Sequence, residues 1–87
     1  MKHRDSCLDG IAGSLPTLAR AAKTAQRLDN GGPDGVPFAA EPITSVEAGV
    51  RVLRLVQRAQ ASGVDIDQAV RDATRAWEDE IRAAEEP

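Results

Sequence analysis

The stretch TSVEAGVRVLRLVQRAQASGVDIDQAV, residues 44–70, contains the starts of two helices and the turn that would join them. Thr44 is followed three residues later by Glu47, which is the spacing of a capping box. In this motif the threonine side chain bonds the third amide of the helix, and the glutamate reaches back to the cap amide. Asp65 repeats the pattern with Gln68. The stretch therefore predicts two helices joined as an antiparallel hairpin, because the turn between them is short.

The expected helix over residues 45–61 is apolar around much of its circumference and ends before Gly63. A helix with such a wide apolar surface is expected to be buried against two neighbours. Its basic residues are expected to face acids of the following helix rather than nucleic acid. The apolar positions are Val46, Val50, Leu53 and Val56 in one stripe, widened by Val52, Leu55 and Ala59. The basic positions are Arg51, Arg54 and Arg58.

The expected helix over residues 66–84 is amphipathic over about five turns. Its outer face carries acids and arginines three or four residues apart, and such surface pairs contribute a few tenths of a kcal/mol each. The apolar positions are Ile66, Ala69, Val70, Ala73, Trp77, Ile81 and Ala84. The surface pairs are Asp72 with Arg75, Arg75 with Asp79, and Glu78 with Arg82.

A further helix is expected over residues 14–29, with Ser14 as its N-cap and Pro16 in its first turn, where the missing N–H costs nothing. Asn30 and Gly31 supply its stop. The apolar positions at helical spacing are Leu15, Leu18, Ala22, Ala25 and Leu28. The other side carries Arg20, Lys23 and Arg27, which we expect to form a solvated face.

Residues 30–43 are expected to form a linker or an ordered loop between the first two helices. Three prolines and three glycines in DNGGPDGVPFAAEP, residues 29–42, break both helical and strand periodicity. Phe38 with Val36 could hold the middle of this segment against the helices, since an aromatic is unusual in a disordered linker. Residues 1–13 are expected to be a flexible lead-in.

These segments together predict a single all-α domain, a three-helix unit with a helix hairpin and a linker rich in proline and glycine. The chain has 87 residues, and domains of this size bury only about 60% of the surface that the unfolded chain exposes. Alanine supplies much of the 41% hydrophobic content and buries little area per residue. We therefore expect the fold to be completed by a homodimer or by docking on another helical protein.

Charge and hydropathy argue against two classes of protein. The net charge is −3, and residues 63–87 hold eight acids and three bases, whereas a general nucleic-acid binder presents a basic face to phosphates. No stretch reaches the roughly 18 consecutive apolar residues of a membrane span. The start MKHRDSC has no apolar run for a signal peptide, so we expect a cytoplasmic protein.

Side chains that carry chemistry are scarce. His3 is the only histidine and Cys7 the only cysteine, which leaves no Ser-His-Asp or Cys-His arrangement, no disulfide within the chain and no cysteine-rich zinc site. The glycines of GIAG and NGGPDG neither follow an apolar strand nor precede the lysine of a phosphate loop. The acids gather at helix ends, where caps and dipoles account for them, and a magnesium site needs several oxygens converging on one point. We expect no catalytic residue.

Two segments resemble a known family. SCLDGIAGSLPTLARAAKTAQRL, residues 6–28, resembles the segment of MazG proteins that leads into their C-terminal helical domain: a serine, a Leu-Asp pair and an LP step precede a helix rich in alanine and lysine. VEAGVRVLRLVQRAQASGVDIDQAVRDATRAWEDEIRAAE, residues 46–85, looks like the end of that domain. There a glutamate-bearing helix, a Gly-Val-Asp turn and a final helix with an aromatic follow in the same order.

The resemblance implies an all-α nucleoside triphosphate pyrophosphohydrolase, which cuts an NTP to the monophosphate and pyrophosphate. MazG proteins hold Mg²⁺ with a Glu-Glu-X-X-Glu motif on one helix and a Glu-X-X-Asp motif on the next, and they work as dimers or larger assemblies. Acids three or four residues apart share one helical face, so two such faces make an oxygen cage for a metal bound to a triphosphate.

Little of this metal site carries over to the present sequence. Glu47 aligns with the first acid of Glu-X-X-Asp, but Val50 stands at the aspartate position. The helix with Glu-Glu-X-X-Glu would fall in the proline and glycine segment, whose only acids are Asp29, Asp34 and Glu41. Glu47 is the one surviving ligand position, so we expect no cofactor, and Mg²⁺ only if residual family activity remains.

The resulting expectation is a degenerate MazG-like helical domain that serves as a non-catalytic association module. The surface expected to make its interface comprises Val46, Val50, Leu53, Val56, Trp77 and Ile81. One alternative is a weak Mg²⁺-dependent NTP pyrophosphohydrolase that completes its site between subunits. Another is nucleotide or nucleic-acid binding through the three arginines of residues 51–58.

Overall fold

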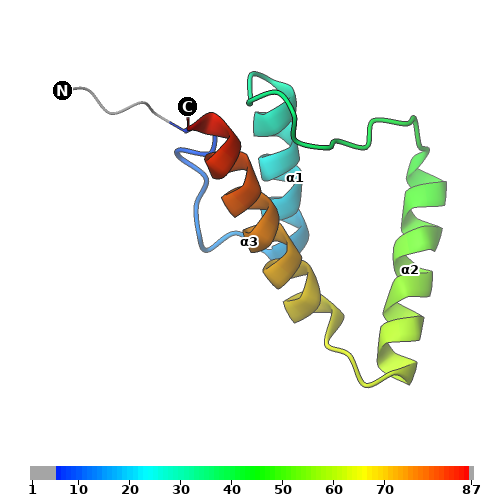
Figure 1. The fold of residues 1–87 in the computed structure, drawn as a ribbon. Coiled ribbons are helices and arrows are strands. Elements are labelled where there is room, and N and C mark those ends of the chain that lie inside the picture. Colours follow the sequence, from blue (N-terminus) through cyan, green and yellow to red (C-terminus); the bar gives the residue numbers. More distant parts are fainter. Residues whose placement is uncertain (1–5, 87) are drawn as a thin grey trace.

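The computed structural model describes residues 6–86 and contains three helices (Figure 1). Helix α1 spans Thr17–Asp29, α2 spans Ser45–Ala61 and α3 spans Ile66–Glu85. No strand occurs among the residues that the structure describes. The predicted all-α class is confirmed, and the predicted bounds of the second and third helices agree with the structure to within one residue.

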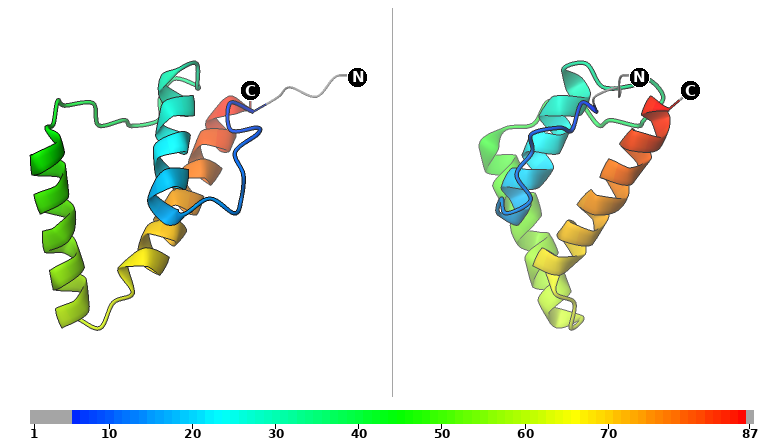
Figure 2. Two further views of the ribbon diagram at one scale, coloured as in Figure 1. Left: turned by 180° about the vertical axis from the view of Figure 1, so that it is seen from behind. Right: turned by 90° about the vertical axis from the view of Figure 1, so that its left-hand side faces the viewer.

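Helices α1 and α3 pack side by side, whereas α2 stands apart from both (Figures 1 and 2). The extended connection from residue 30 to residue 44 carries the chain from the end of α1 to the far end of α2. Helix α2 then returns to α3 through a short turn, and the two helices diverge from that turn. Within residues 6–86, Ala59 is the one residue of α2 that is buried, so the hairpin is open.

Both helix starts of the hairpin have the predicted caps. The Thr44 hydroxyl accepts a hydrogen bond from the Glu47 amide at 3.1 Å, and the Asp65 carboxylate accepts one from the Gln68 amide at 3.1 Å. The acidic and amide side chains point forward along their helices, Glu47 to Arg51 and Gln68 to the Asp72 carboxylate. Each capping box is therefore half formed. The cap side chain accepts the predicted hydrogen bond from the helix amide, whereas the Glu47 and Gln68 side chains bond residues further along the helix instead of the cap amide.

The turn between α2 and α3 is fixed by one glycine and one backbone hydrogen bond. Gly63 has a φ of +70°, a conformation that other L-residues rarely adopt. The Val64 amide then donates to the Ala59 carbonyl at 2.8 Å, which satisfies a carbonyl at the end of α2. The sequence signal at Gly63 therefore located the end of this helix correctly.

The predicted start of α1 at Ser14 is wrong. The helix begins at Thr17, and Pro16 holds the N-cap position with an extended ψ of 154°. Leu15 precedes this proline, and the proline ring disfavours a helical conformation at the residue before it. The helix therefore begins only after Pro16, although the end of α1 at Asp29 agrees with the prediction.

The lead-in is ordered over residues 6–13, contrary to the prediction of a flexible segment. The Cys7 amide donates to the Glu85 carboxylate at 2.8 Å, and the Arg27 guanidinium donates to the carbonyls of Cys7 and Asp9. Leu8 is buried in a cluster with Leu28 and Ile81. The predicted lead-in also includes residues 1–5 with His3, which lie outside the described residues.

The apolar core is small and lies between the lead-in, α1 and the C-terminal half of α3. It consists of Leu8, Leu28 and Ile81, which is fully buried, with Val36 and Trp77 packed against its edge. Val36 thus holds the connection after α1 to the core, as the sequence suggested. The companion residue Phe38 is 39% exposed and contributes less to this anchor. Three buried apolar side chains make a thin core, as the length and the alanine content predict.

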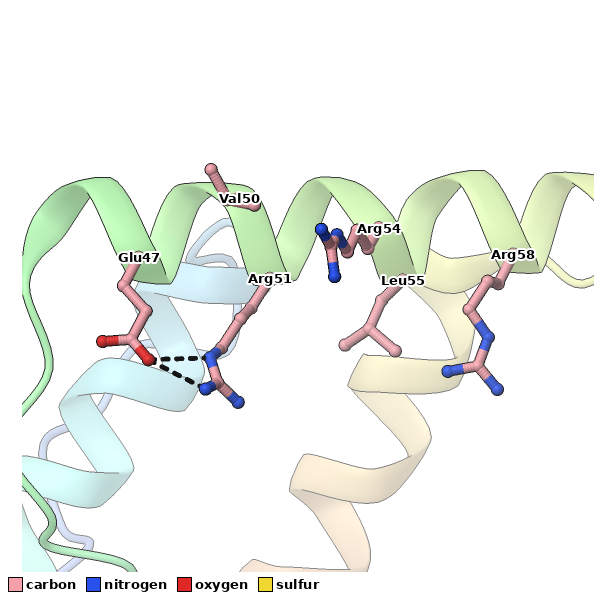
Figure 3. Close-up of a pocket in the computed structure, with 6 residues that line it drawn as sticks. All are labelled: Glu47, Val50, Arg51, Arg54, Leu55 and Arg58. Carbon is pink, nitrogen blue, oxygen red and sulfur yellow. Dashed lines mark hydrogen bonds and ion pairs between the residues drawn. The ribbon is translucent and has the colours of Figure 1, made fainter.

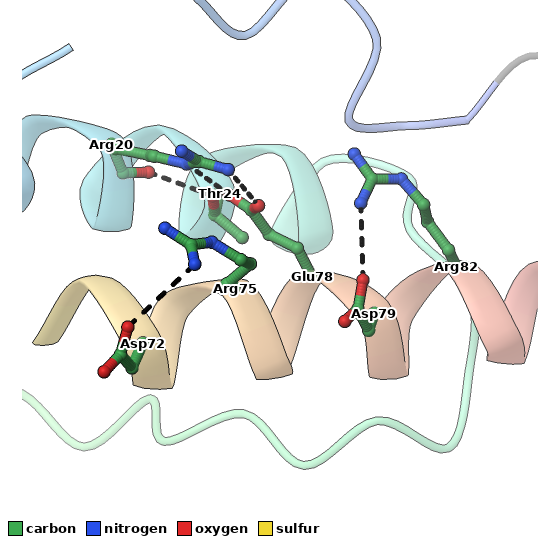
Figure 4. Close-up of polar contacts among 7 residues, drawn as sticks. All are labelled: Arg20, Thr24, Asp72, Arg75, Glu78, Asp79 and Arg82. Atoms are coloured by element: carbon green, nitrogen blue, oxygen red, sulfur yellow. Dashed lines mark hydrogen bonds and ion pairs between the residues drawn. The ribbon is translucent and has the colours of Figure 1, made fainter. Parts of the chain in front are cut away.

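A buried ion pair joins α1 to α3 (Figure 4). Arg20 donates two hydrogen bonds to Glu78, from Nε to Oε2 at 3.0 Å and from Nη2 to Oε1 at 2.6 Å. The Thr24 hydroxyl lies 2.9 Å from both Glu78 Oε2 and the Arg20 carbonyl. Thr24 and Glu78 are almost completely buried. The hydrogen bond from Arg20 lowers the pKa of Glu78, against burial that would raise it.

This ion pair corrects the predicted faces of α1. Arg20 and Arg27 are half-buried and bonded rather than solvated, while Leu18, placed on the apolar face by its spacing, is 60% exposed. The bidentate bonds to Glu78 offset the cost of removing the Arg20 guanidinium from water. The face of α1 that packs on α3 is consequently the one bearing Thr17, Arg20, Thr24 and Leu28.

The surface pairs of α3 follow the prediction only in part. Asp72 and Arg75 lie 4.0 Å apart as an exposed pair, as expected. Arg82 pairs with Asp79 at 3.8 Å rather than with Glu78, because Glu78 is engaged by α1 (Figure 4). One side chain of a predicted surface pair is thus the centre of the interface between two helices.

Replacing Glu78 by alanine should destabilise the fold strongly. The change leaves the Arg20 charge without its buried partner, and loss of one member of a buried pair costs about 3 to 5 kcal/mol. We expect this loss in the free energy of unfolding, measured by urea denaturation followed by circular dichroism. Asp79→Asn is the matched control, since its exposed pair contributes under about 1 kcal/mol. Equal effects of the two variants would contradict the role assigned to Glu78.

Stability should fall in acid through the same carboxyl group. The pKa of Glu78 is lowered in the folded chain, so its stabilising contribution is present above the ordinary glutamate value of 4.5 and is lost as pH falls through the folded pKa. We expect the wild type to lose more stability than Glu78→Gln between about pH 5 and pH 2. Parallel pH profiles for the two proteins would show that Glu78 is not the responsible group.

Candidate functional site

Glu47, the one metal-ligand position that the resemblance to MazG proteins suggested, lies in the exposed first turn of α2. Its carboxylate accepts two hydrogen bonds from the Arg51 guanidinium, from Nε at 3.1 Å and from Nη2 at 2.8 Å (Figure 3). Both side chains are largely exposed, so the pair is a surface pair within one helix. In this structure the Glu47 carboxylate is therefore already paired with a positively charged side chain of the same helix.

The other acids do not gather around Glu47. Across residues 6–86 no group of three or more His, Cys, Asp or Glu side chains is arranged to hold a metal ion. Val50, where the resemblance to MazG proteins would call for an aspartate, offers no oxygen ligand. Mg²⁺ requires near-octahedral coordination by oxygen, and one carboxylate supplies only part of it. The described residues of one chain therefore supply no magnesium cage.

A shallow groove runs along α2 beside Glu47 (Figure 3). Arg51 and Arg58 project toward α1 and α3, whereas Val50 projects to the opposite side. Neither Arg54 nor Arg58 forms an ion pair within the described part of the chain, so the expected pairing with acids of α3 is not made. The lining residues are Glu47, Val50, Arg51, Arg54, Leu55 and Arg58.

The apolar stripe of α2 faces solvent along its whole length. Val46 is 75% exposed, Leu53 57%, Val50 47% and Val56 38%. Val46 and Leu53 lie four and three residues from Val50, so they share the side of α2 that points away from α1 and α3. These four members of the predicted interface therefore remain available to a partner. Burial against two neighbours, which the sequence suggested, does not occur within the single chain.

The two predicted interface residues of α3 have different surroundings. Trp77 is half-buried at the edge of the core and keeps part of its ring at the surface. Ile81 is fully buried against Leu8 and Leu28. The assignment of Ile81 to an interface is therefore corrected: it belongs to the core and has no surface left for a partner.

A second surface lies on α3, and only its Trp77 was predicted from the sequence to belong to an interface. Ala69, Val70, Ala73, Thr74 and Trp77 line an open, mainly apolar groove. Helical spacing identified four of these residues as a face that should be buried. The signal was therefore present, but spacing alone does not show whether the covering element comes from the same chain. In the structure α1 packs against the neighbouring face, around Thr74, Glu78 and Ile81.

Cys7 does not have the environment of a reactive thiol. Burial raises its pKa, and the hydrogen bond and negative charge of Glu85 raise it further. The thiolate is the nucleophile and the metal ligand, so a raised pKa disfavours both roles near neutral pH. Cys7 is a free, half-buried cysteine next to the contact between the lead-in and α3.

None of the three helices, in the part of the chain described here, combines the length and the apolar character required to cross a bilayer.

Comparison with known proteins finds a curated relative in Streptomyces cacaoi, named "Uncharacterized 26.1 kDa protein in blaB 3'region". It is 38% identical over 86 residues, which cover 97% of this chain and 34% of the relative. The chain thus spans about one third of the length of the curated relative that it matches. No family model matches the sequence, and no solved structure is similar to it.

Proposed function

We propose that the chain is a MazG-type helical domain that lacks its metal-binding helix and serves in the cytoplasm as a non-catalytic association module. The order of the two MazG-like segments supports this origin. The segment where the first acidic motif would fall is an extended connection rather than a helix. Where the second motif would supply its aspartate, the chain has Val50.

The exposed apolar stripe of α2 carries the proposal. Burying a valine or leucine side chain completely contributes about 1.5 to 3 kcal/mol. Val46, Val50, Leu53 and Val56 are each between 38% and 75% exposed, so covering all four would contribute on the order of 4 kcal/mol. An apolar surface left open over a whole helix is typical of an interaction site. Helix α2 has its own N-cap and a well-formed turn at its end, so the exposed stripe lies on a folded helix that a partner can bind.

The length of the relative is consistent with a module. Almost all of this chain aligns with a protein about three times as long, so a domain of this kind occurs beside other sequence. A helix that is open on the isolated domain can then be covered by another copy or by a different helical protein. Nucleic acid is a less suitable partner, since α3 is acidic and Arg51 is already paired with Glu47.

Association should depend on Leu53. We expect the wild type to sediment at micromolar concentration as a species heavier than the 9.2 kDa monomer. Leu53→Glu should raise the dissociation constant by at least about tenfold, because it replaces an apolar contact by a charge. Leu18→Glu, at an equally exposed position of α1, is the control that should leave association unchanged. A wild type that is strictly monomeric and melts cooperatively would refute the proposal.

Catalysis is tested separately by pyrophosphate release from a mixture of NTPs with Mg²⁺, for the wild type beside Glu47→Ala. We expect no release from either protein, since one carboxylate cannot assemble the metal site. Release by the wild type that disappears in Glu47→Ala would instead support a weak pyrophosphohydrolase with a site shared between subunits. Release that is equal in both would indicate a contaminating enzyme and leave the association module in place.

A further inference from the structure

The chain carries two exposed apolar surfaces of opposite shape. One is the α2 stripe, formed by the projecting side chains of Val46, Val50, Leu53 and Val56. The other is the α3 groove, lined by Ala69, Val70, Ala73, Thr74 and Trp77. We propose that the α2 stripe of one copy packs into the α3 groove of a second copy, and the reverse, which closes a two-fold dimer. This inference rests on the proposed association function and names the partner and the contact.

The α3 groove has the form that an apolar helix requires. Ala69 and Ala73 lie one turn apart and are exposed, and their small side chains let a second helix approach closely. Val70 and Trp77 are half-buried and bound the groove. Helices pack by placing the side chains of one in the grooves between residues three and four apart on the other. Leucine and valine side chains of α2 match this requirement.

The α2 stripe is not covered by its own chain in this arrangement. Helix α2 leaves the turn at Gly63 with Val50 directed away from α1 and α3 (Figure 3), and Val46 and Leu53 lie four and three residues from Val50 on the same side. Its buried contact is limited to Ala59, next to the turn. In an open hairpin of this kind, α2 extends away from the rest of the chain and can pack against a second copy. Exchange of an identical element between two copies is a common and inexpensive route to a dimer.

Charge favours the same pairing. Helix α2 has three arginines and one glutamate, net +2, and α3 has six acids and three arginines, net −3. Arg54 and Arg58 have no carboxylate partner in the described part of their own chain. Glu80 follows Trp77 by three residues and so lies at the edge of the groove. Helix α2 against α3 of the partner brings opposite charges together, whereas α2 against α2 would bring arginines together.

A second copy is the occupant that accounts for both surfaces at once. Each chain offers one stripe and one groove, so two copies related by a two-fold axis cover all four surfaces. A different helical protein would need its own stripe and its own groove in matching positions. Leu53 and Ala73 lie at similar distances from the turn between the helices, so they should face each other across the exchanged contact.

The arrangement is tested by crosslinking single-cysteine chains in a Cys7→Ser background. Leu53→Cys and Ala73→Cys chains, one of them tagged to differ in mass, are mixed in urea, refolded together and treated with a short bismaleimide. We expect crosslinked dimers that contain one chain of each kind, and little product from either variant alone. Leu18→Cys mixed with Ala73→Cys is the matched control and should give no crosslinked dimer.

The outcomes separate this inference from the proposed function. Crosslinking of Leu53→Cys chains to each other would show an α2–α2 contact and refute the inference while leaving association intact. A dimer by sedimentation without any Leu53–Ala73 product would also refute it. A chain that is strictly monomeric and melts cooperatively would overturn the inference and the proposed function together.

Discussion

The fold depends on the bidentate pair between Arg20 of α1 and Glu78 of α3. Both charges are withdrawn from most of the solvent, so the bonds between them, with the Thr24 hydroxyl, must offset the desolvation of two ions. Because the geometry of a guanidinium and a carboxylate is specific, the pair fixes the rotation of each helix about its own axis. The apolar core of Leu8, Leu28 and Ile81 then forms beside it.

This rotation has a consequence for the surfaces that remain. The faces of α1 and α3 that meet contain threonines and an ion pair. Some of the apolar residues that recur at helical spacing on both helices therefore remain exposed to solvent. Leu18 is exposed on α1, and the Ala69 to Trp77 groove is open on α3. Helix α2 is exposed for a different reason: its turn at Gly63 and the long connection before it hold it away. Within a single chain, the central ion pair is therefore buried and fully bonded, while many apolar side chains remain exposed.

That imbalance is the physical basis for proposing association rather than catalysis. A hydrolytic metal site would need converging carboxylates, whereas Asp65 serves as a helix cap, Asp67 as a surface partner of arginine and Glu78 as the buried partner of Arg20. Glu47 shows the difference directly, since its carboxylate bonds the guanidinium one turn away. What the chain has in excess is apolar surface on stable helices, and another chain is a suitable cover for such a surface.

The sequence alone determined the class of fold, the ends of α2 and α3 and the caps at Thr44 and Asp65, because these depend on neighbours within four residues. It also identified the apolar stripe of α2. Only the tertiary structure decided which faces are buried. It showed that Glu78 pairs with Arg20 of α1 rather than with Arg82, and that Ile81 lies in the core. Helical spacing counts apolar residues on a face, but a buried bidentate pair can outweigh that count, and its two members lie 58 residues apart.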